Sequence, residues 1–445
     1  MLKSALKGLL PAVLVLLLTG SAGAQDREGW SLQQCIDYAL QNNIQIKTQE
    51  VSLENAEASL EQAKAQQYPT LNFSSSFGAN FQNVTTYNEY MEKAGGMSVS
   101  NNFGLNSGLA LYQGGRLRNT VKQSQVQRDA TELDVEQARI DLEISVAQAF
   151  LQVLYNHEAL DLNRQAEELS ARQVERGEQL FQAGSISRVE LAQLKSQHAS
   201  DQYQCVAAEN TLENSRLQLK QLLELGLDQP FDIRYPVIDD SVVGAPIPDL
   251  ADVYAEALAT LPQMKSSELD IESADLGVKI AKGSALPSIS MNAGISTGYS
   301  SGSGARYFDQ LGNKLGESLG LNLSLPIFNG KQVRTNIKKA ELQLASARLQ
   351  DASARKQLLS TLESVRNDAV SAQQRYFASK TQLDAAAESF RLVTEQFNAG
   401  IKNTVELLTE KNNYLSARSQ QIQAKYQALL AEKLLGRYMN QPIEL

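Results

Sequence analysis

Side chains suited to acid–base or metal chemistry are few in this 445-residue sequence. Histidine occurs only at His157 and His198, and cysteine only at Cys35 and Cys205. No nucleophile elbow, phosphate-binding glycine loop or His/Cys ligand cluster accompanies them. The two cysteines could pair in an oxidising compartment, or both could remain unpaired on helices. We therefore expect no catalytic residue, no metal site and no cofactor, with an enzyme as a remote alternative.

One acidic motif occurs twice. A Val-Glu-Leu sequence places Glu190 and Glu406 shortly after Gly184 and Gly400, and each of these glycines ends a Phe-x-Ala-Gly sequence. Glycine adopts positive φ at no steric cost, so both glycines are expected to mark tight turns. The simplest interpretation of each glutamate is a place in the first turn of a helix, where a carboxylate favours the helix dipole by about 0.3–1 kcal/mol.

The repeated motif is part of a duplication that spans most of the chain. Ala39-Leu40 recurs as Ala257-Leu258, at an offset of 218 positions. From residues 104–106, which recur as 320–322, the offset is 216, so a loop before this point is two residues longer in the first copy. We assign the chain as follows: signal peptide 1–24, first copy 25–225, ordered linker 226–247, second copy 248–437 and C-terminal tail 438–445.

The N-terminus carries the features of a secretory signal peptide. Lys3 and Lys7 precede an apolar run over residues 9–18, and small residues follow up to Ala24. A membrane anchor is the alternative, but the run is too short to span a bilayer comfortably. Without residues 1–24 the chain has 39 basic and 50 acidic residues, a net charge of −11. This balance argues against a nucleic-acid partner.

Long helices are expected in both copies. They are predicted at 31–67, 116–180 and 189–224 in the first copy, and at 332–396 and 405–436 in the second. At ~1.5 Å per residue, the two longest reach on the order of 100 Å. Their apolar residues recur at the 3–4 spacing typical of coiled coils. In the first copy the two shorter helices together match the long one, so we expect them to stack end to end beside it.

Four strands follow from strict alternation of apolar and small polar residues. They are predicted at 70–82, 103–113, 288–300 and 318–328. Each has about the length of a tilted strand that crosses a bilayer. A soluble sandwich or hairpin is the alternative, which the long polar segments 83–102 and 301–317 disfavour because they resemble the outer loops of a barrel.

Four strands cannot close a membrane barrel, because two edges would remain open. The chain is therefore expected to oligomerise. A dimer would supply eight strands, whose interior side chains fill, whereas a trimer would supply twelve and leave a pore. The strands join their helices at the same end, so the barrel is expected at one end of a helical column and the Gly184 and Gly400 turns at the other.

The duplication, the strand that ends in Leu325-Pro326-Ile327-Phe328-Asn329-Gly330 and the two Ala-Gly turns resemble the TolC-type outer membrane efflux protein family over nearly all of the mature chain. The resemblance implies a mostly α-helical homotrimer with a 12-stranded membrane β-barrel and a long periplasmic α-helical tunnel. It also implies a passive exit duct in the outer membrane, docked through a periplasmic adaptor to an inner-membrane pump in efflux or type I secretion. A coiled-coil surface adhesin or an adaptor protein is the alternative.

Family members close the tunnel near the helix turns with acidic rings and a few intersubunit bonds. By position, Glu406 resembles the first acidic ring and Glu190 the matching acid of the first copy. The second ring falls on Thr409, so it is absent here or displaced to Glu410. The remaining matches are Lys402, at the place of a basic bond partner, and Phe397, in place of a latch tyrosine.

The turns are also candidates for contact with the adaptor. An alternative for their apolar residues is helix–helix packing inside each hairpin. The candidate contact residues are Gly184, Val189 and Leu191 in the first copy and Gly400, Val405 and Leu407 in the second.

Overall fold

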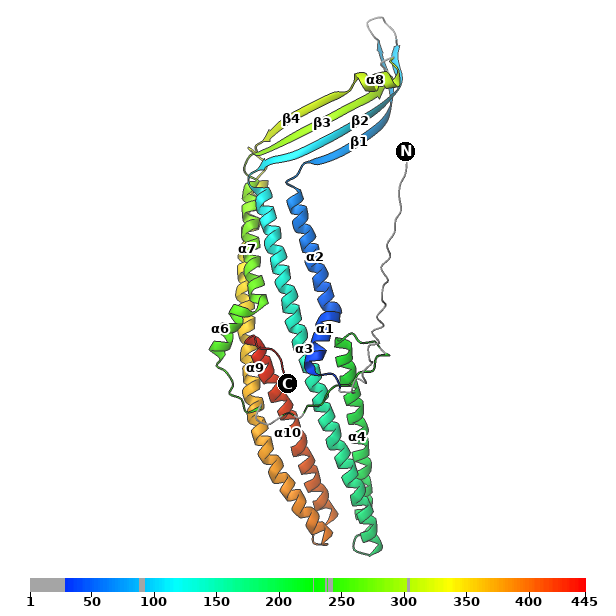
Figure 1. Cartoon of the computed structure of the whole chain (residues 1–445), viewed down its shortest axis with the longest axis vertical. Coiled ribbons are helices and arrows are strands. Elements are labelled where there is room, and N and C mark those ends of the chain that lie inside the picture. The colour runs from blue at the N-terminus through cyan, green and yellow to red at the C-terminus, as the bar shows by residue number, and fades with distance from the viewer. Residues whose placement is uncertain (1–28, 88–92, 227, 237, 239–242, 302–304) are drawn as a thin grey trace, which may run out of the picture.

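Long helices and a small sheet give the chain an elongated form, with the sheet at one end (Figure 1). The computed structural model describes residues 29–87, 93–226, 228–236, 238, 243–301 and 305–445. The predicted signal peptide at 1–24 lies outside these residues. Among the described residues, no helix is both long and apolar enough to cross a membrane.

The sheet has four antiparallel strands in the order β1-β2-β3-β4. The strands are β1 (Thr70–Tyr87), β2 (Lys93–Gln113), β3 (Ser288–Ser300) and β4 (Gly316–Ser324). The loop predicted at 83–102 is wrong for the described residues 83–87 and 93–102, which belong to β1 and β2 and pair in an antiparallel ladder with one irregularity between Gln82 and Thr86. Backbone pairing in such a ladder does not require apolar side chains, so a polar sequence can extend a hairpin.

The second hairpin departs from prediction at two places. The predicted loop 301–317 contains a short helix, α8 (Tyr307–Asn313), and the start of β4. The strand predicted to reach residue 328 ends at Ser324. Pro326 explains this end, since proline has no N–H to give to a ladder. Leu325 and Ile327 therefore lie beyond the strand, and both are exposed.

The register gives the sheet two chemically distinct faces. Phe73 pairs with Leu105, and Leu105 pairs with Ile295, so these side chains share one face. The same alternation places on it Leu71, Phe77, Phe81, Phe103, Leu109, Met291, Leu319, Leu321 and Leu323. The opposite face consists of small polar residues, among them Asn72, Ser74, Gly104, Asn106, Gly294, Ser296, Ser318 and Gly320.

The helices form two related sets. The first set is α1 (Leu32–Asn42), α2 (Ile44–Ala65), α3 (Arg116–Gln182) and α4 (Arg188–Leu222). The second set is α6 (Leu250–Thr260), α7 (Pro262–Gly283), α9 (Gln332–Asn398) and α10 (Thr404–Tyr438). In the first set α1 and α2 pack along one part of α3, and α4 packs along the rest (Figure 1).

The helix predicted over 31–67 is broken at Asn43. This residue is extended, with ψ of 132°, and its side chain accepts a hydrogen bond from the backbone of Gln45 as the N-cap of α2. Its amide also donates to the Leu222 carbonyl at 3.1 Å. An asparagine side chain readily forms hydrogen bonds to nearby backbone groups when its own backbone is not helical. The break therefore costs little free energy here, and it adds a contact to α4.

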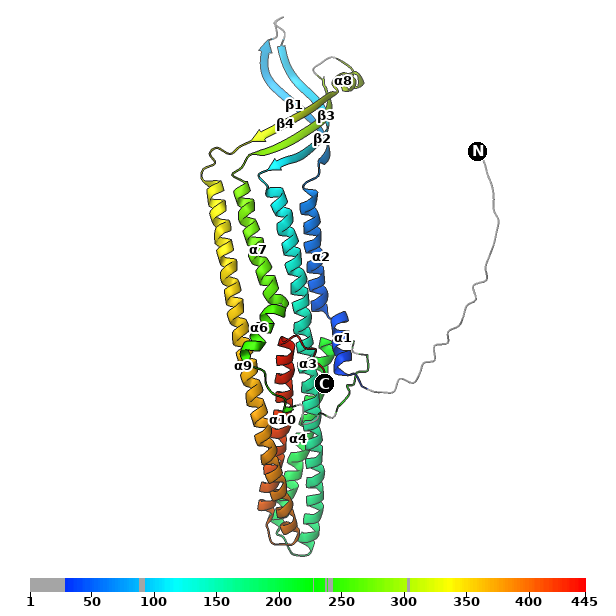
Figure 2. The ribbon, with the colours of Figure 1, turned by 60° about the vertical axis from the view of Figure 1, so that its left-hand side comes forward.

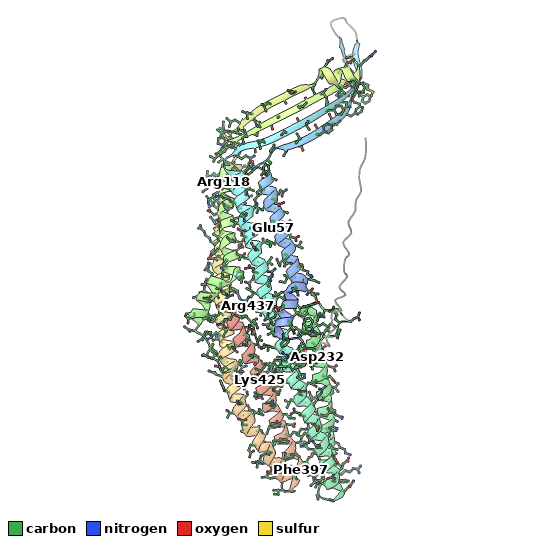
Figure 3. All side chains as sticks on the ribbon, viewed as in Figure 1. Glu57, Arg118, Asp232, Phe397, Lys425 and Arg437 are labelled. Carbon is green, nitrogen blue, oxygen red and sulfur yellow. The ribbon has the colours of Figure 1, made fainter. Side chains whose placement is uncertain are left out.

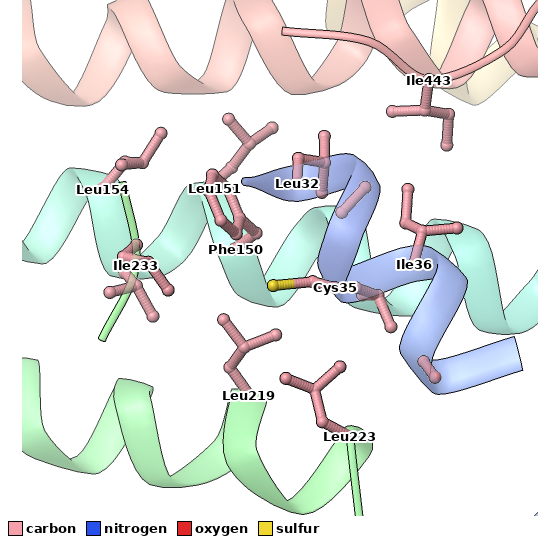
Figure 4. Close-up of a cluster of buried hydrophobic side chains, with 14 of the residues drawn as sticks. Leu32, Cys35, Ile36, Phe150, Leu151, Leu154, Leu219, Leu223, Ile233 and Ile443 are labelled. Carbon is pink, nitrogen blue, oxygen red and sulfur yellow. The ribbon is translucent and has the colours of Figure 1, made fainter. Parts of the chain in front are cut away.

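The main hydrophobic core lies where α1, α3, α4 and the linker meet (Figure 4). Phe150 of α3, Leu219 of α4 and Cys35 of α1 are all buried in it. Ile233 of the linker joins them, and a short parallel bridge pairs it with Trp30. The linker thus packs against the middle of the molecule. This packing fixes the helices next to the sheet relative to the two hairpins at the other end.

Candidate functional site

The predicted turns lie together at the end of the molecule farthest from the sheet (Figures 1 and 2). One turn joins α3 to α4 and the other joins α9 to α10. Gly184 and Gly400 have φ of 72° and 76°, a conformation that favours glycine. Both turns therefore use the residue type that their backbone requires.

The helices that lead into the two turns, α3 and α9, each end in a Schellman motif. In the first turn the Ser185 N–H donates to the Leu180 carbonyl at 2.8 Å, and in the second the Ile401 N–H donates to the Gln396 carbonyl at 2.9 Å. These bonds satisfy carbonyl groups that a helix end leaves without partners. The two turns thus share one backbone design.

Both candidate glutamates complete capping boxes at the start of the returning helix. Glu190 accepts from the Ser187 N–H at 2.7 Å, while Ser187 Oγ accepts from the Glu190 N–H at 3.2 Å. Glu406 and Asn403 form the same reciprocal pair at 3.1 and 2.9 Å. The helix-terminal role expected for these acids is therefore present in both copies.

The second glutamate has a further partner. Lys402 Nζ lies 2.5 Å from Glu406 Oε1, and both side chains are more than one-third exposed. The hydrogen bond from Lys402, followed by that from the Asn403 N–H, lowers the pKa of Glu406. The first copy has Ile186 at the position of Lys402, so this charge compensation is specific to the second turn. In this chain Lys402 pairs within its own turn.

The residues at the possible second acidic position, Thr409 and Glu410, form hydrogen bonds within their own hairpin. Thr409 Oγ1 donates to the Val405 carbonyl of its own helix at 2.8 Å. Glu410 accepts from Ser389 Oγ of α9 at 2.9 Å, inside the hairpin. The structure thus brings Lys402 and Glu406 together, while Thr409 and Glu410 bond to their own hairpin.

The candidate residues for contact with an adaptor differ in solvent exposure. Val189 and Val405 are 67% and 55% exposed at the tips. Leu191 is partly buried, and Leu407 is only 1% exposed inside the second hairpin. Phe397, near the free end of that hairpin (Figure 3), is also buried. The valines are therefore the side chains of this set that a partner can reach.

One ion pair near the turns was not predicted from the sequence. Lys411 of α10 is fully buried and lies 2.5 Å from Asp201 of α4, on the other hairpin. A lysine is rarely buried unless it is paired, and its partner here is 210 residues away in the chain. The only signal in the sequence was a lysine within an otherwise coiled-coil helix, which usually indicates a solvated face.

Each histidine contacts another side chain, and Cys35 is buried. His157 stacks on Tyr235 with ring centroids 3.8 Å apart, and His198 Nδ1 lies 3.2 Å from Ser170 Oγ. Desolvation raises the pKa of the Cys35 thiol to about 12. Within the described parts of the chain, no group of three or more His, Cys, Asp or Glu is placed to hold a metal ion.

The family model described as "Outer membrane efflux protein" matches residues 35–224 and 253–441. Among curated relatives, TolC of Escherichia coli is 22% identical over 436 residues, covering 96% of this chain and 85% of TolC. Toxin and drug export protein A of Aggregatibacter actinomycetemcomitans is 23% identical, with 90% and 84% covered. The pyoverdine export outer membrane protein OpmQ of Pseudomonas putida is 25% identical, with 69% and 63% covered.

Solved structures share the fold. CusC superposes with a TM-score of 0.79 at 18% identity, covering 92% of each chain. VceC of Vibrio cholerae gives 0.77 at 18% identity, covering 93% of this chain and 97% of that one. The open MtrE channel of Neisseria gonorrhoeae gives 0.75 at 19% identity, with 93% and 90% covered. The predicted fold class, mostly helical with four membrane-type strands, is confirmed.

Proposed function

The chain belongs to the outer membrane efflux protein family and is an outer membrane exit duct with a periplasmic helical extension, and on that premise we propose that it works as a homotrimer whose helical tips dock to a periplasmic adaptor and an inner-membrane pump. The observation that carries the proposal is the four-stranded sheet, which has two open edges and two contrasting faces.

The open edges support a closed oligomer. Within the chain β1 pairs with β2 and β4 pairs with β3, so the outer sides of β1 and β4 have backbone groups free to bond to a neighbour. In lipid such groups must be satisfied. Pairing β4 of one chain with β1 of the next satisfies them and closes a barrel. Twelve strands from three chains are enough to leave an aqueous interior, whereas eight strands are filled by side chains.

The faces support the same arrangement. Side chains on the apolar face are largely exposed in the single chain, with Phe73 at 69%, Phe77 at 73% and Leu319 at 77%. Burying such side chains in lipid is favourable by roughly 1.5–3 kcal/mol each. The Asn, Ser and Gly face would then line the pore, where small polar residues leave room for a solute.

The tips are proposed as the periplasmic aperture and its docking surface. Glu190 and Glu406 place carboxylates around the aperture, with Lys402 and Thr409 beside the second of them. Val189 and Val405 offer exposed apolar contacts to an adaptor. Since Lys402 compensates Glu406, Glu190 is expected to contribute more to any cation preference than Glu406 does.

Native mass spectrometry of the protein in detergent tests the oligomeric state, with a trimer as the expected mass. Planar-bilayer recording then tests the aperture: Glu190→Gln should reduce cation selectivity, and Glu406→Gln should reduce it less. Glu54→Gln, an exposed acid on α2 far from the turns, is the matched control. Detection of monomers or dimers alone would overturn the trimer, and unchanged selectivity in Glu190→Gln would overturn the acidic aperture.

A further inference from the structure

Basic residues gather where the sheet meets the helices. Four helix ends lie at this level: the end of α2, the start of α3, the end of α7 and the start of α9 (Figures 1 and 2). Beyond residue 24 the chain has 39 basic and 50 acidic residues, and the segments 62–69, 114–122, 278–287 and 325–340 at these ends hold ten of the basic residues and no acid. The ten are Lys64, Arg116, Arg118, Lys122, Lys279, Lys282, Lys331, Arg334, Lys338 and Lys339.

Most of these cations have no acidic partner. Two of them reach acids farther along their helices: Lys279 pairs with Asp275 at 2.7 Å, and Lys338 pairs with Glu341 at 3.8 Å. Among the described residues, no acid forms an ion pair with the other eight, and all eight are exposed. We call these eight the cation belt: Lys64, Arg116, Arg118 (labelled in Figure 3), Lys122, Lys282, Lys331, Arg334 and Lys339. Like charges held near one another repel, so the belt favours bound anions.

A groove at one end of the belt combines charge with apolar surface. It has a volume of about 900 Å³ and lies where the chain passes from β4 into α9. Ile327 and Phe328 line it and are 92% and 88% exposed. Lys331 and Arg334 line it as well, and the acid in its lining, Glu341, is already paired. Large exposed apolar side chains beside unpaired cations fit a ligand that carries both hydrocarbon and a negative charge.

The next chain of the proposed trimer does not neutralise this groove. β4 is an open edge of the sheet, and closing the barrel brings β1 of the next chain to it. Residues 62–69, which lead into β1, contain Lys64 and no acid, and the nearest acid before them is Glu61 on α2. The neighbour therefore adds a cation at this level, and the balancing negative charge is best supplied from outside the protein.

We propose that the cation belt binds the headgroups of anionic phospholipids at the periplasmic face of the outer membrane, with one lipid seated in the groove of each chain. The inference rests on the membrane position of the sheet and, for the surroundings of the groove, on the proposed trimer. The lipid phosphate lies between Lys331 and Arg334, because a guanidinium can donate two parallel hydrogen bonds to phosphate oxygens. The acyl chains lie along Ile327 and Phe328.

The position of the belt favours lipid over an acidic protein as the partner. The belt begins where the membrane strands end, so the headgroups of the periplasmic leaflet lie at its level. Clusters of Lys and Arg at the end of a membrane-spanning element attract anionic headgroups. Aromatic side chains are also enriched at such interfaces. Tyr68, which is 71% exposed just before β1, and Phe328 occupy this level.

Native mass spectrometry of the purified oligomer with added lipid tests the site. Phosphatidylglycerol and phosphatidylcholine with identical acyl chains are supplied at equal concentration, and the bound molecules of each are counted. The wild type should retain phosphatidylglycerol about tenfold more. Lys331→Asn combined with Arg334→Gln should remove most of this preference, and asparagine tolerates the φ of 70° at position 331. Phe328→Ser should weaken the binding of both lipids and leave the preference unchanged.

Arg348→Gln combined with Lys356→Gln is the matched control, because it removes the same charge from exposed positions of α9. Arg348 lies ~20 Å farther along the helix than Arg334, beyond the range of screened charges, so the preference should not change. The lipid site is overturned if the wild type retains both lipids equally, if the control loses the preference too, or if equimolar inorganic phosphate displaces the phosphatidylglycerol. If the double groove variant does not assemble, Arg334→Gln alone decides. Monomers or dimers alone in the same spectra would instead overturn the trimer.

Discussion

The two hairpins share a backbone design and differ in what surrounds their side chains. Both turns have a glycine at positive φ, and both returning helices start with a capping box. Yet Phe181 is 41% exposed while its equivalent Phe397 is 4% exposed. Local sequence therefore determines the turn, whereas the neighbouring helices determine which side chains are buried. A duplicated segment can keep its fold and take on a different role.

The same contrast holds at the junctions between strand and helix. Gly114 and Gly330 occupy equivalent places and have φ of 61° and 60°. A Cβ at Gly114 would lie 2.3 Å from the Gly283 carbonyl oxygen, but a Cβ at Gly330 would meet nothing within 4 Å. The first junction is enclosed by the chain itself. The second lies at the β4 edge, where the proposed trimer places the next chain.

The phenylalanine pair gives the largest expected difference between the copies. Phe397→Ala should reduce the free energy of unfolding by about 3–5 kcal/mol, because it empties a buried site. Phe181→Ala should cost only about 1 kcal/mol, as is usual for a half-exposed position. Urea denaturation of the two purified variants measures this difference. Equal losses would mean that a neighbouring chain buries Phe181, and the comparison between single hairpins would fail.

The junction glycines give the next largest difference. Gly114→Ala should destabilise the protein by roughly 3 kcal/mol or more, since it adds a collision with backbone to a left-handed conformation that alone costs ~1–2 kcal/mol. Gly330→Ala should show the conformational cost alone. The thermal midpoints of the two variants can be compared directly. A Gly330→Ala midpoint as low as that of Gly114→Ala would show that the second junction is also closely packed in the assembly.

The smallest expected effect concerns pH at the two turns. The folded-state pKa of Glu406 is lowered by Lys402, so the stabilising charge is present above the unfolded pKa and is lost as pH falls through the folded value. Lys402→Met removes the main cause of that lowering. The second turn of the variant should therefore loosen at a higher pH than in the wild type. Hydrogen exchange of residues 401–410, corrected for intrinsic rates, measures this.

The first turn supplies the control for that experiment. It has Ile186 where the second has Lys402, so exchange at residues 185–194 should not respond to Lys402→Met. A response in both turns would indicate that the hairpins move as one body and that Lys402 acts beyond its own turn.

Much of the fold followed from periodicity, because the 3.6 and 2.0 residue patterns of long elements are strong signals. The exceptions were local. The predicted 83–102 loop became part of a hairpin, since ladder hydrogen bonds between backbones do not depend on apolar side chains. The single helix at 31–67 broke at Asn43, whose side chain accepts from the Gln45 N–H as a helix cap and donates to the Leu222 carbonyl of α4.

The candidate site was predicted unevenly for a similar reason. Turn positions and both capping glutamates depend on residues within a few positions, so the sequence placed them at 184, 190, 400 and 406. The partner of Lys402 proved to be Glu406, four residues away in the same chain. The partner of Lys411 could not be foreseen, because Asp201 is 210 residues distant and the repeat equivalent Lys195 bonds elsewhere.

By itself the sequence determined the duplication, the turns and the two faces of the strands, because each depends on residues close together in the chain. Only the tertiary structure decided which copy of each motif is buried and that Lys411 crosses to the other hairpin. These depend on which elements become neighbours, and two copies with similar local patterns do not specify that difference. The asymmetry between the repeats is a product of packing.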